Sequence, residues 1–374
     1  MISIELKQTE LESIARRIKI LVDSKGLRKQ PLGIYSVEPK TIVFSHSNLT
    51  DGVALWASTT CDIGEIFEKS VDPELFPDIV TSFPDENMVI EIASTLVMRN
   101  SRSSNKITMR YVDKEFEKRP IIAGEPIKIP CNVLKNMLQQ GASFTSKDKV
   151  ILVNSMTQLS FNGNQVRFCS ASTGSRIVYG TTKIEVSNKD SKIYIPGISA
   201  EKISKILPSV DKEVLLYQMP NTYFIQTDDI LIKTTPYVGE FNPKIEEYLH
   251  QDSIQIASFD RELLSKALHI LALMAKMEGY VNEEYADLVQ VFPEDDDVKV
   301  SFYKNQDTKL QIGKQTSRFE PLFFNRIFLE EFISKVTTSD LEFRKLPSDN
   351  YPPLKFCDSE QTFCMILSQV KVWD

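Results

Sequence analysis

A unit of one strand followed by one helix recurs about six times along this 374-residue chain, and this repeat limits the folds that the chain can adopt. In the first copy, ISIEL (2–6) alternates apolar and polar residues as a strand does. Thr9 is the expected N-cap of the helix that follows, and Gly26 is its expected stop. The apolar residues expected on the core side of this helix are Leu11, Ile14, Ala15, Ile18, Leu21 and Val22.

Five further copies repeat this pattern at a spacing of about 62 residues. Alternating runs with turn residues lie between the helices, and the Asn-Gly pair at 163 predicts a hairpin. In the second copy, Asp72 and Pro73 suit a helix start, while Pro77 is expected to bend or shorten the helix. The acidic run 293–297 is expected to be a solvated hairpin loop. The predicted helices are 9–25, 72–83, 131–141, 198–208, 260–278 and 325–336.

This organisation predicts an α+β fold in which each unit is one helix backed by antiparallel strands. A chain of this length is too long for one core, and two units would form a domain of ordinary size. The expected architecture is three tandem similar domains, each with two helices backed by antiparallel sheets, giving six pseudo-repeats per chain. The predicted domains are 1–121, 122–247 and 248–374.

Charge and composition favour a soluble intracellular protein. Asp and Glu number 51 against 44 Lys and Arg, a net charge of −7, which argues against simple electrostatic capture of nucleic acid. The opening MISIELKQTE lacks a secretion signature, and no apolar run approaches the length of a membrane span. The five cysteines are odd in number and widely spaced, so a reducing compartment without a disulfide framework or zinc site is expected.

Catalytic motifs are missing from the sequence, so a non-enzyme is expected. His46, His250 and His269 have no metal-ligand spacing, and His269 is expected on or near the apolar face of its helix. The loop in SASTGSRIVYG (170–180) first suggests a phosphate cradle, a nucleophile turn or a plain hairpin. It matches neither a nucleophile elbow nor a phosphate-binding glycine motif, which removes support for the first two.

Several stretches, in order along the whole chain, resemble the bacterial DNA polymerase III β subunit, or β sliding clamp. PELFPDIVTSFPDENMVIEI with LVMRNSRSSNKITM is similar to the family's second helix and the strand pair after it. STGSRIV is similar to its "TDGHRLA" loop, and TTPYVGEFNPKIEEYL to the linker before its third domain. FFNRIFLEEFISKV resembles "FNxxYLxDxLxxL", and FCMILSQVKV occupies the place of its C-terminal strand.

The resemblance implies the DNA clamp fold, in which two chains form a head-to-tail homodimeric ring with helices facing a DNA-sized hole. Such a ring holds double-stranded DNA topologically and without reading sequence, which is compatible with a net acidic protein. Strand addition between edges near 101–112 and 270–305 is expected to close the ring. The expected DNA-contacting residues are Arg16, Arg17, Lys19, Arg28, Lys29, Lys202, Lys205 and Lys266, with Arg28 nearest the family's loop arginine.

The resemblance also implies an apolar pocket between domains 2 and 3 for short hydrophobic peptides of DNA polymerase, the clamp loader and repair proteins. Arg176 has two interpretations: a polar anchor at the pocket rim, or a buried arginine that pins the domain interface. Departures from the family pattern at Thr173, Ser175 and the C-terminal tail predict altered peptide preference. The expected pocket residues are Gly174, Arg176, Ile177, Pro243, Asn325, Phe328, Leu354, Leu367 and Ser368.

The function implied by the resemblance is that of a processivity factor without cofactor or metal, since ATP belongs to a separate loader. A bacterial cytoplasmic location follows, in a specialised replisome such as that of a phage or plasmid. The alternative is a clamp-fold scaffold that binds partners without encircling DNA. The balance of basic and acidic residues in the predicted helices keeps this alternative open.

Overall fold

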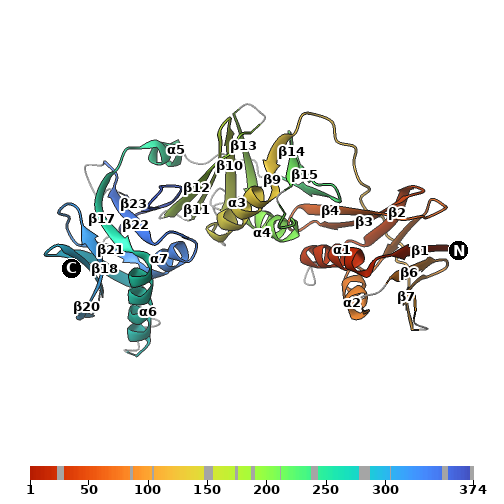
Figure 1. Ribbon diagram of the computed structural model, residues 1–374, viewed down its shortest axis with the longest axis horizontal. Coiled ribbons are helices and arrows are strands. Elements are labelled where there is room, and N and C mark those ends of the chain that lie inside the picture. The colour runs from red at the N-terminus through yellow and green to blue at the C-terminus, as the bar shows by residue number, and fades with distance from the viewer. Residues whose placement is uncertain are drawn as a thin grey trace. The chain divides into compact units, whose positions relative to one another are not determined.

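Strand β1 (Ile2–Leu6) leads into helix α1 (Gln8–Leu21), as the first predicted repeat requires. Five of the six apolar positions expected to face the core, from Leu11 to Leu21, are buried. In this computed structural model the chain alternates such helices with antiparallel strands (Figure 1), which confirms the predicted α+β class. The structure describes residues 1–374 except 23–28, 85–86, 103–104, 147–154, 173–175, 187–189, 211, 237–242, 278–286, 304, 348–352 and 371–374.

The chain divides into two compact units, and the three predicted domains remain a prediction. Unit 1 comprises Met1–Gln139, Phe161–Gly163 and Glu185–Tyr237, and unit 2 comprises the remaining residues. Helix α3 (Cys131–Ser143) and strand β10 (Met156–Asn162) contribute residues to both. No helix among the described ranges is long and apolar enough to cross a membrane.

Unit 1 contains a four-stranded sheet in the order β1-β6-β7-β8 and an eight-stranded sheet in the order β5-β2-β3-β4-β16-β15-β14-β9. Helix α1 packs against both α2 and α4. The elements are β2 (Leu32–Glu38), β3 (Thr41–Asn48), β4 (Val53–Thr60), β5 (Glu68–Val71), α2 (Leu75–Ser82), β6 (Met88–Ile92), β7 (Leu96–Asn100), β8 (Lys106–Met109), β9 (Ile127–Pro130), β13 (Ser191–Pro196), α4 (Gly197–Ile206), β14 (Glu213–Met219), β15 (Thr222–Gln226) and β16 (Ile230–Thr234).

Unit 2 contains strands in the order β10-β11-β12-β24-β23-β22-β17-β20-β19-β18-β21. Helix α6 packs on β17, β19 and β20 and against α7. The elements are β11 (Gln165–Ser172), β12 (Arg176–Lys183), α5 (Pro243–His250), β17 (Ile254–Asp260), α6 (Arg261–Met277), β18 (Leu288–Glu294), β19 (Asp297–Phe302), β20 (Asn305–Gln315), β21 (Leu322–Asn325), α7 (Arg326–Ile333), β22 (Asp340–Lys345), β23 (Leu354–Asp358) and β24 (Phe363–Leu367).

The same strand arrangement occurs in both units, and in each it joins segments far apart in the sequence. In unit 1, β4 pairs antiparallel with β16, so that Leu55 lies opposite Ile232. In unit 2, β12 pairs antiparallel with β24, so that Tyr179 lies opposite Cys364. Each junction joins the last strand of one repeat to the last strand of another, and this closes continuous sheets.

An extended segment, residues 111–123, covers one face of the large sheet of unit 1. The Phe116 ring lies 5.5 Å from the Tyr35 ring, measured between centroids. The backbone oxygen of Glu117 accepts a hydrogen bond of 2.9 Å from the Trp56 indole N–H. A Cβ on Gly33 would lie 2.1 Å from the Phe116 ring, so the absence of a side chain at this position allows the segment to lie close to the sheet.

Several expectations about local structure are corrected. Helix α1 begins at Gln8 after the extended residue Lys7, so Thr9 lies inside the helix and is not its N-cap. Helix α2 begins at Leu75 rather than at Pro73, and Asp72 instead accepts a hydrogen bond from the Glu74 amide in the preceding turn.

Other corrections concern longer-range features, while the two predicted hairpins are confirmed. His269 is exposed on α6, next to the exposed apolar residue Ile270, and is therefore not a core residue. Cys357 and Cys364 form a disulfide, which their spacing in the sequence did not reveal because strand pairing brings them together. The hairpins at Gly163 and at the acidic run 293–297 connect β10 to β11 and β18 to β19.

Candidate nucleic-acid interface and partner pocket

A hollow of about 420 Å³ lies on the helix side of unit 1 and gathers basic side chains. Helix α1 contributes Arg16 and Arg17, α3 contributes Lys135 and α4 contributes Lys205, while Glu12 is the one acidic residue of the lining. Three helices thus bring four cations to one concave surface, although they lie far apart in the sequence. The arrangement suits a phosphate backbone, which is contacted by Lys and Arg without regard to base sequence.

Each predicted DNA-contacting cation in the described ranges has a carboxylate partner. Five of these cations are at least 46% exposed, whereas Arg17 and Lys202 are 13% and 20% exposed. Exposed pairs are weak, so their cations can exchange a carboxylate for a phosphate at little cost. Arg28 lies outside the described residues. The pairs are Arg16–Glu12, Arg17–Asp229, Lys19–Asp78, Lys29–Glu74, Lys202–Asp51, Lys205–Glu201 and Lys266–Glu262.

The Arg17–Asp229 pair is structural in character. Its two atoms lie 2.5 Å apart and join α1 to the turn before β16. Burial alone would raise the pKa of Asp229, but the hydrogen bond and charge of Arg17 outweigh it and the pKa is lowered. Arg17 therefore holds two elements of unit 1 together.

Lys135 is a site residue that sequence reasoning missed. Its ammonium donates to the Leu207 backbone oxygen at 3.0 Å and to the Ser209 hydroxyl at 2.6 Å. Both acceptors follow the C-terminal end of α4, where the helix dipole favours a cation. The sequence signal was available, since Lys135 falls in the predicted helix 131–141 and lies off its apolar positions.

The predicted partner pocket centres on Arg176, which is 6% exposed. Its guanidinium forms an ion pair with Glu331, and its Nε donates to the Ser172 hydroxyl at 3.3 Å. The guanidinium carbon lies 4.5 Å from the Phe328 ring centroid and 5.3 Å from that of Phe144. Glu331 and Phe144 were missed, although Glu331 lies three residues after Phe328 and therefore on the same helix face.

Sheet pairing brings two more predicted pocket residues beside Arg176, and helix α7 connects a third to Phe328. Leu367 at the end of β24 lies opposite Arg176 on one side and Leu354 on the other. Asn325 caps α7, because its side chain accepts a hydrogen bond of 2.9 Å from the Ile327 amide. This cap positions the first turn of the helix that carries Phe328.

The other predicted pocket residues are less closely associated with Arg176. Ile177 is half-buried, and strand alternation directs its side chain to the sheet face opposite Arg176. Ser368 is exposed directly after β24, and Pro243 begins α5. Gly174 lies outside the described residues. The pocket roles of all these residues remain predictions.

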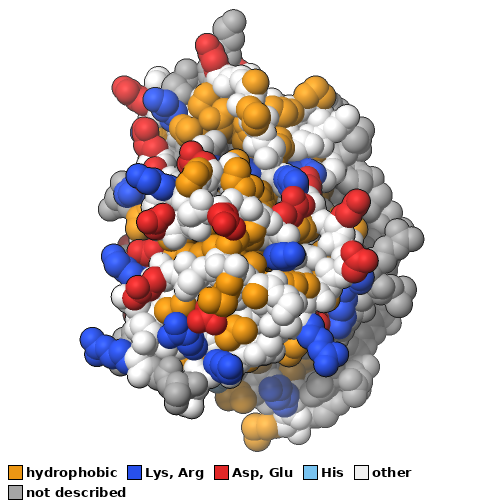
Figure 2. Space-filling view, turned by 90° about the vertical axis from the view of Figure 1, so that its right-hand side faces the viewer, with side chains coloured by type: hydrophobic (Ala, Val, Ile, Leu, Met, Phe, Trp, Pro, Cys, Tyr) orange, Lys and Arg blue, Asp and Glu red, His pale blue; other side chains and the backbone are white. Residues whose placement is uncertain are grey.

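Among the last strands of the repeats, β8 and β20 each keep an edge without a strand partner in the described parts of the chain, and helix α6 exposes one apolar face. Strand β8 pairs only with β7, and β20 pairs with β19 along its length but with β17 only at 313–315. This corrects the expected edge in 270–305, which contains α6, β18 and β19. Helix α6 exposes an apolar stripe. Figure 2 views a different surface, the β1 and β6 side of unit 1, and shows apolar side chains among charged ones there. The stripe comprises Leu263, Ile270, Leu273 and Met277, each at least 42% exposed.

Possible metal ligands and one buried histidine complete the description of the polar side chains. No group of three or more His, Cys, Asp or Glu residues suited to a metal ion occurs among them. Burial lowers the pKa of His46, partly offset by its hydrogen bond to the Pro31 carbonyl, so this histidine is a neutral core residue.

Repeated helix-and-sheet units, closed by antiparallel strand junctions, define the class of the fold as that of a DNA clamp. Among solved structures, a DNA polymerase III β chain from Streptococcus pneumoniae superposes with a TM-score of 0.86 at 14% identity. DNA polymerase sliding clamps from Pseudomonas aeruginosa and Bacillus subtilis give TM-scores of 0.85 and 0.84 at 15% and 14% identity. All three comparisons cover 100% of both chains.

This chain has the fold of the bacterial DNA polymerase III β subunit, the sliding clamp, as expected from the sequence resemblance. No family model and no curated protein matches the sequence. Sequence has therefore diverged much further than the arrangement of helices and strands.

Proposed function

We propose that this chain is a divergent, non-catalytic DNA sliding clamp of the bacterial cytoplasm. Two copies would close head to tail around duplex DNA and tether a polymerase, a clamp loader or repair proteins through the pocket at Arg176. The observation that carries this proposal is the repeated strand junction, formed once in each unit by β4 with β16 and by β12 with β24. A third junction of the same kind requires a second chain.

The strands left for that third junction are β8 and β20, the remaining last strands of their repeats. Antiparallel pairing of β8 with β20 of the partner would repeat the two junctions within the chain. Helix packing supports the same assembly: α1 packs on α4 beside the first junction, and by repetition α6 would pack on α2 of the partner. The apolar α6 stripe and Leu75 of α2, which is 56% exposed, would then be covered.

A closed ring explains how an acidic chain could retain DNA. Because the hold is topological, the helix surface needs only weak, exchangeable phosphate contacts, and the exposed pairs of Arg16, Lys19 and Lys205 meet this requirement. Tight contacts would oppose sliding. The hollow bounded by α1, α3 and α4 is the surface proposed to follow the DNA backbone.

The size of the protein in solution tests the ring. A particle of about 85 kDa, twice the 42.7 kDa chain, is expected by sedimentation equilibrium. Leu273→Lys should give the 42.7 kDa species because it places a charge in the proposed interface, whereas the matched control Ile66→Lys, at a loop residue 70% exposed, should not. A monomeric wild-type protein at micromolar concentration would contradict the ring.

A clamp-fold scaffold that never encircles DNA is the second candidate. The pairing of each cation predicted from the sequence, within the described ranges, with a carboxylate favours it, because such pairs reduce the net attraction for phosphate. Retention on DNA separates the two functions. After loading, a sliding clamp should stay on circular duplex DNA and run off the same DNA once it is linearised, whereas a scaffold should be retained on neither.

A further inference from the structure

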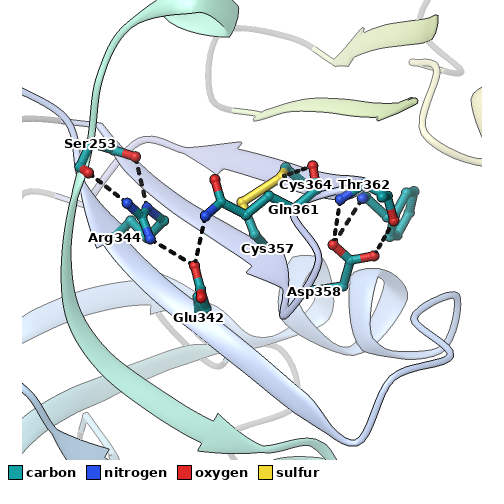
Figure 3. Close-up of a disulfide and its surroundings, with 9 residues drawn as sticks. Ser253, Glu342, Arg344, Cys357, Asp358, Gln361, Thr362 and Cys364 are labelled. Atoms are coloured by element: carbon teal, nitrogen blue, oxygen red, sulfur yellow. Dashed lines mark hydrogen bonds and ion pairs between the residues drawn. A yellow bond between two sulfur atoms is a disulfide. The ribbon is translucent and has the colours of Figure 1, made fainter. Parts of the chain in front are cut away.

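The disulfide between Cys357 and Cys364 lies in the hairpin of β23 and β24 (Figure 3). The two residues are directly opposite each other in the strand ladder, and both are fully buried. The remaining cysteines, Cys61, Cys131 and Cys169, do not form disulfides. The pair therefore cross-links two neighbouring strands that are already joined by backbone hydrogen bonds.

Hydrogen bonds to Asp358 also close the turn of this hairpin. The Asp358 carboxylate accepts hydrogen bonds from the Thr362 amide and hydroxyl, each at 2.6 Å, and from the Phe363 amide at 3.1 Å. The equivalent hairpins β7 with β8 and β15 with β16 contain no cysteine, and the hairpin of β11 with β12 contains only Cys169. The repeated architecture thus forms this hairpin without a disulfide, which leaves the cross-link available for another role.

Strand β24 connects the disulfide to the proposed partner pocket. Leu367 is three residues after Cys364 and lies opposite both Arg176 and Leu354. Separation of β24 from β12 would therefore move the strand end beside the Arg176 guanidinium. The cross-link anchors this strand on its β23 side and so limits such opening.

Charged side chains of both signs lie near the disulfide: the acidic residues are Glu342, directly opposite Cys357 in the strand ladder, and Asp358, the next residue in the chain. Lys355, two residues before Cys357 and on the same face of β23, is 7% exposed, and its ammonium lies 5.4 Å from the Tyr179 ring centroid. Burial lowers the pKa of Lys355, and the charges of Arg344 and Arg167 lower it further. Cations stabilise a thiolate and nearby carboxylates destabilise it, so the charges beside the disulfide act in opposite directions on thiol–disulfide exchange.

Hydrogen-bonded polar side chains lie beside the disulfide, and their separation would give a reductant access to it. The Gln361 amide donates to Glu342 at 3.1 Å, and Arg344 ties the same carboxylate to Ser253 (Figure 3). Gln361 is exposed at the hairpin turn. Release of the exposed Gln361 side chain from Glu342 would therefore begin to uncover the buried sulfur atoms.

We propose that Cys357–Cys364 is a redox switch that controls the opening of β24 and thereby the affinity of the partner pocket for peptides. The control of peptide affinity rests on the proposed function, whereas the control of β24 does not. The reductant is a dithiol. One of its thiolates attacks one cysteine sulfur, the S–S bond breaks, and the other cysteine leaves as a thiolate and takes a proton. The second thiol of the reductant then releases the first cysteine, so the reductant becomes a disulfide and the pair gains two electrons and two protons.

Amide hydrogen exchange on the full chain tests the switch directly. The protein is compared after oxidised glutathione and after dithiothreitol, and alkylation under denaturing conditions should find two more thiols in the reduced sample. Reduction should speed exchange of Phe363–Leu367 by about 5-fold or more, the lower end of allosteric coupling, while β15 and β16 stay unchanged. Cys357→Ser/Cys364→Ser should match the reduced protein, and Cys169→Ser should still respond to reduction. Equal exchange, or an equal thiol count, would overturn the proposal.

Peptide affinity tests the link to the pocket. A fluorescent clamp-binding peptide should bind the oxidised protein about 5-fold or more tightly than the reduced protein. Equal affinity in the two states would refute control of the pocket. Failure of the peptide to bind in either state would refute the proposed function instead, and the exchange measurement would still decide whether the cysteine pair controls β24.

Discussion

Replacement of Arg176 by alanine distinguishes the two roles considered for this residue. The guanidinium is 6% exposed, pairs with Glu331, donates to Ser172 and lies over the rings of Phe328 and Phe144. All of these contacts lie within unit 2. The geometry favours the buried arginine that pins an interface over a rim anchor that waits for a peptide.

The expected loss of stability follows from these contacts. Two cation–π contacts at a desolvated site contribute about 1 kcal/mol each, and loss of the Ser172 hydrogen bond costs about 1 kcal/mol more. Glu331 is 47% exposed and becomes solvated when its partner is removed, so the ion pair adds only about 0.5 kcal/mol. Arg176→Ala should therefore lower the free energy of unfolding by about 3.5 kcal/mol and, with an unfolding entropy of about 2.1 cal/mol/K per residue over 374 residues, the melting temperature by about 4–5 °C.

Thermal and urea unfolding of four proteins measures this effect: wild type, Arg176→Ala, Glu331→Gln and the double variant. Glu331→Gln alone should cost less than about 1 kcal/mol, and the double-mutant cycle should give a small coupling energy. If Arg176→Ala unfolds like wild type but no longer binds a clamp-binding peptide, the arginine is a pocket anchor and the reasoning from burial is wrong.

Three further predictions concern unit 1. Gly33→Ala should destabilise the protein by about 1–3 kcal/mol through a clash with Phe116, and Phe116→Ala in the same chain should relieve part of that loss in urea unfolding. Because the pKa of His46 is lowered, the unfolded chain binds a proton below about pH 6.5 that the folded chain does not. Stability should fall as the pH drops below 6.5, and less so in His46→Gln; an unchanged pH profile would contradict this. Lys135→Ala should lower the number of ions released on DNA binding by up to about one, as measured by the slope of affinity against salt concentration, whereas Lys118→Ala should not.

Local sequence patterns predicted much of the fold. The apolar spacing from Leu11 to Leu21 predicted the buried face of α1, and Asn162-Gly163 predicted the turn between β10 and β11. These features depend on residues within one or two turns of each other, so the local sequence is sufficient. Helix ends were less accurate, because Thr9 and Asp72 can accept hydrogen bonds at more than one position near a helix start.

The sequence by itself determined the six-fold repeat, the α+β class and the positions of most helices, because periodic burial acts over short stretches of chain. Only the tertiary structure decided which strands close the sheets, which carboxylate holds Arg17 from 212 residues away, and that Cys357 faces Cys364. It also showed that Arg176 is buried and that its guanidinium contacts the rings of Phe144 and Phe328. Such pairings depend on which distant segments share a sheet or a core, and no local pattern encodes that choice.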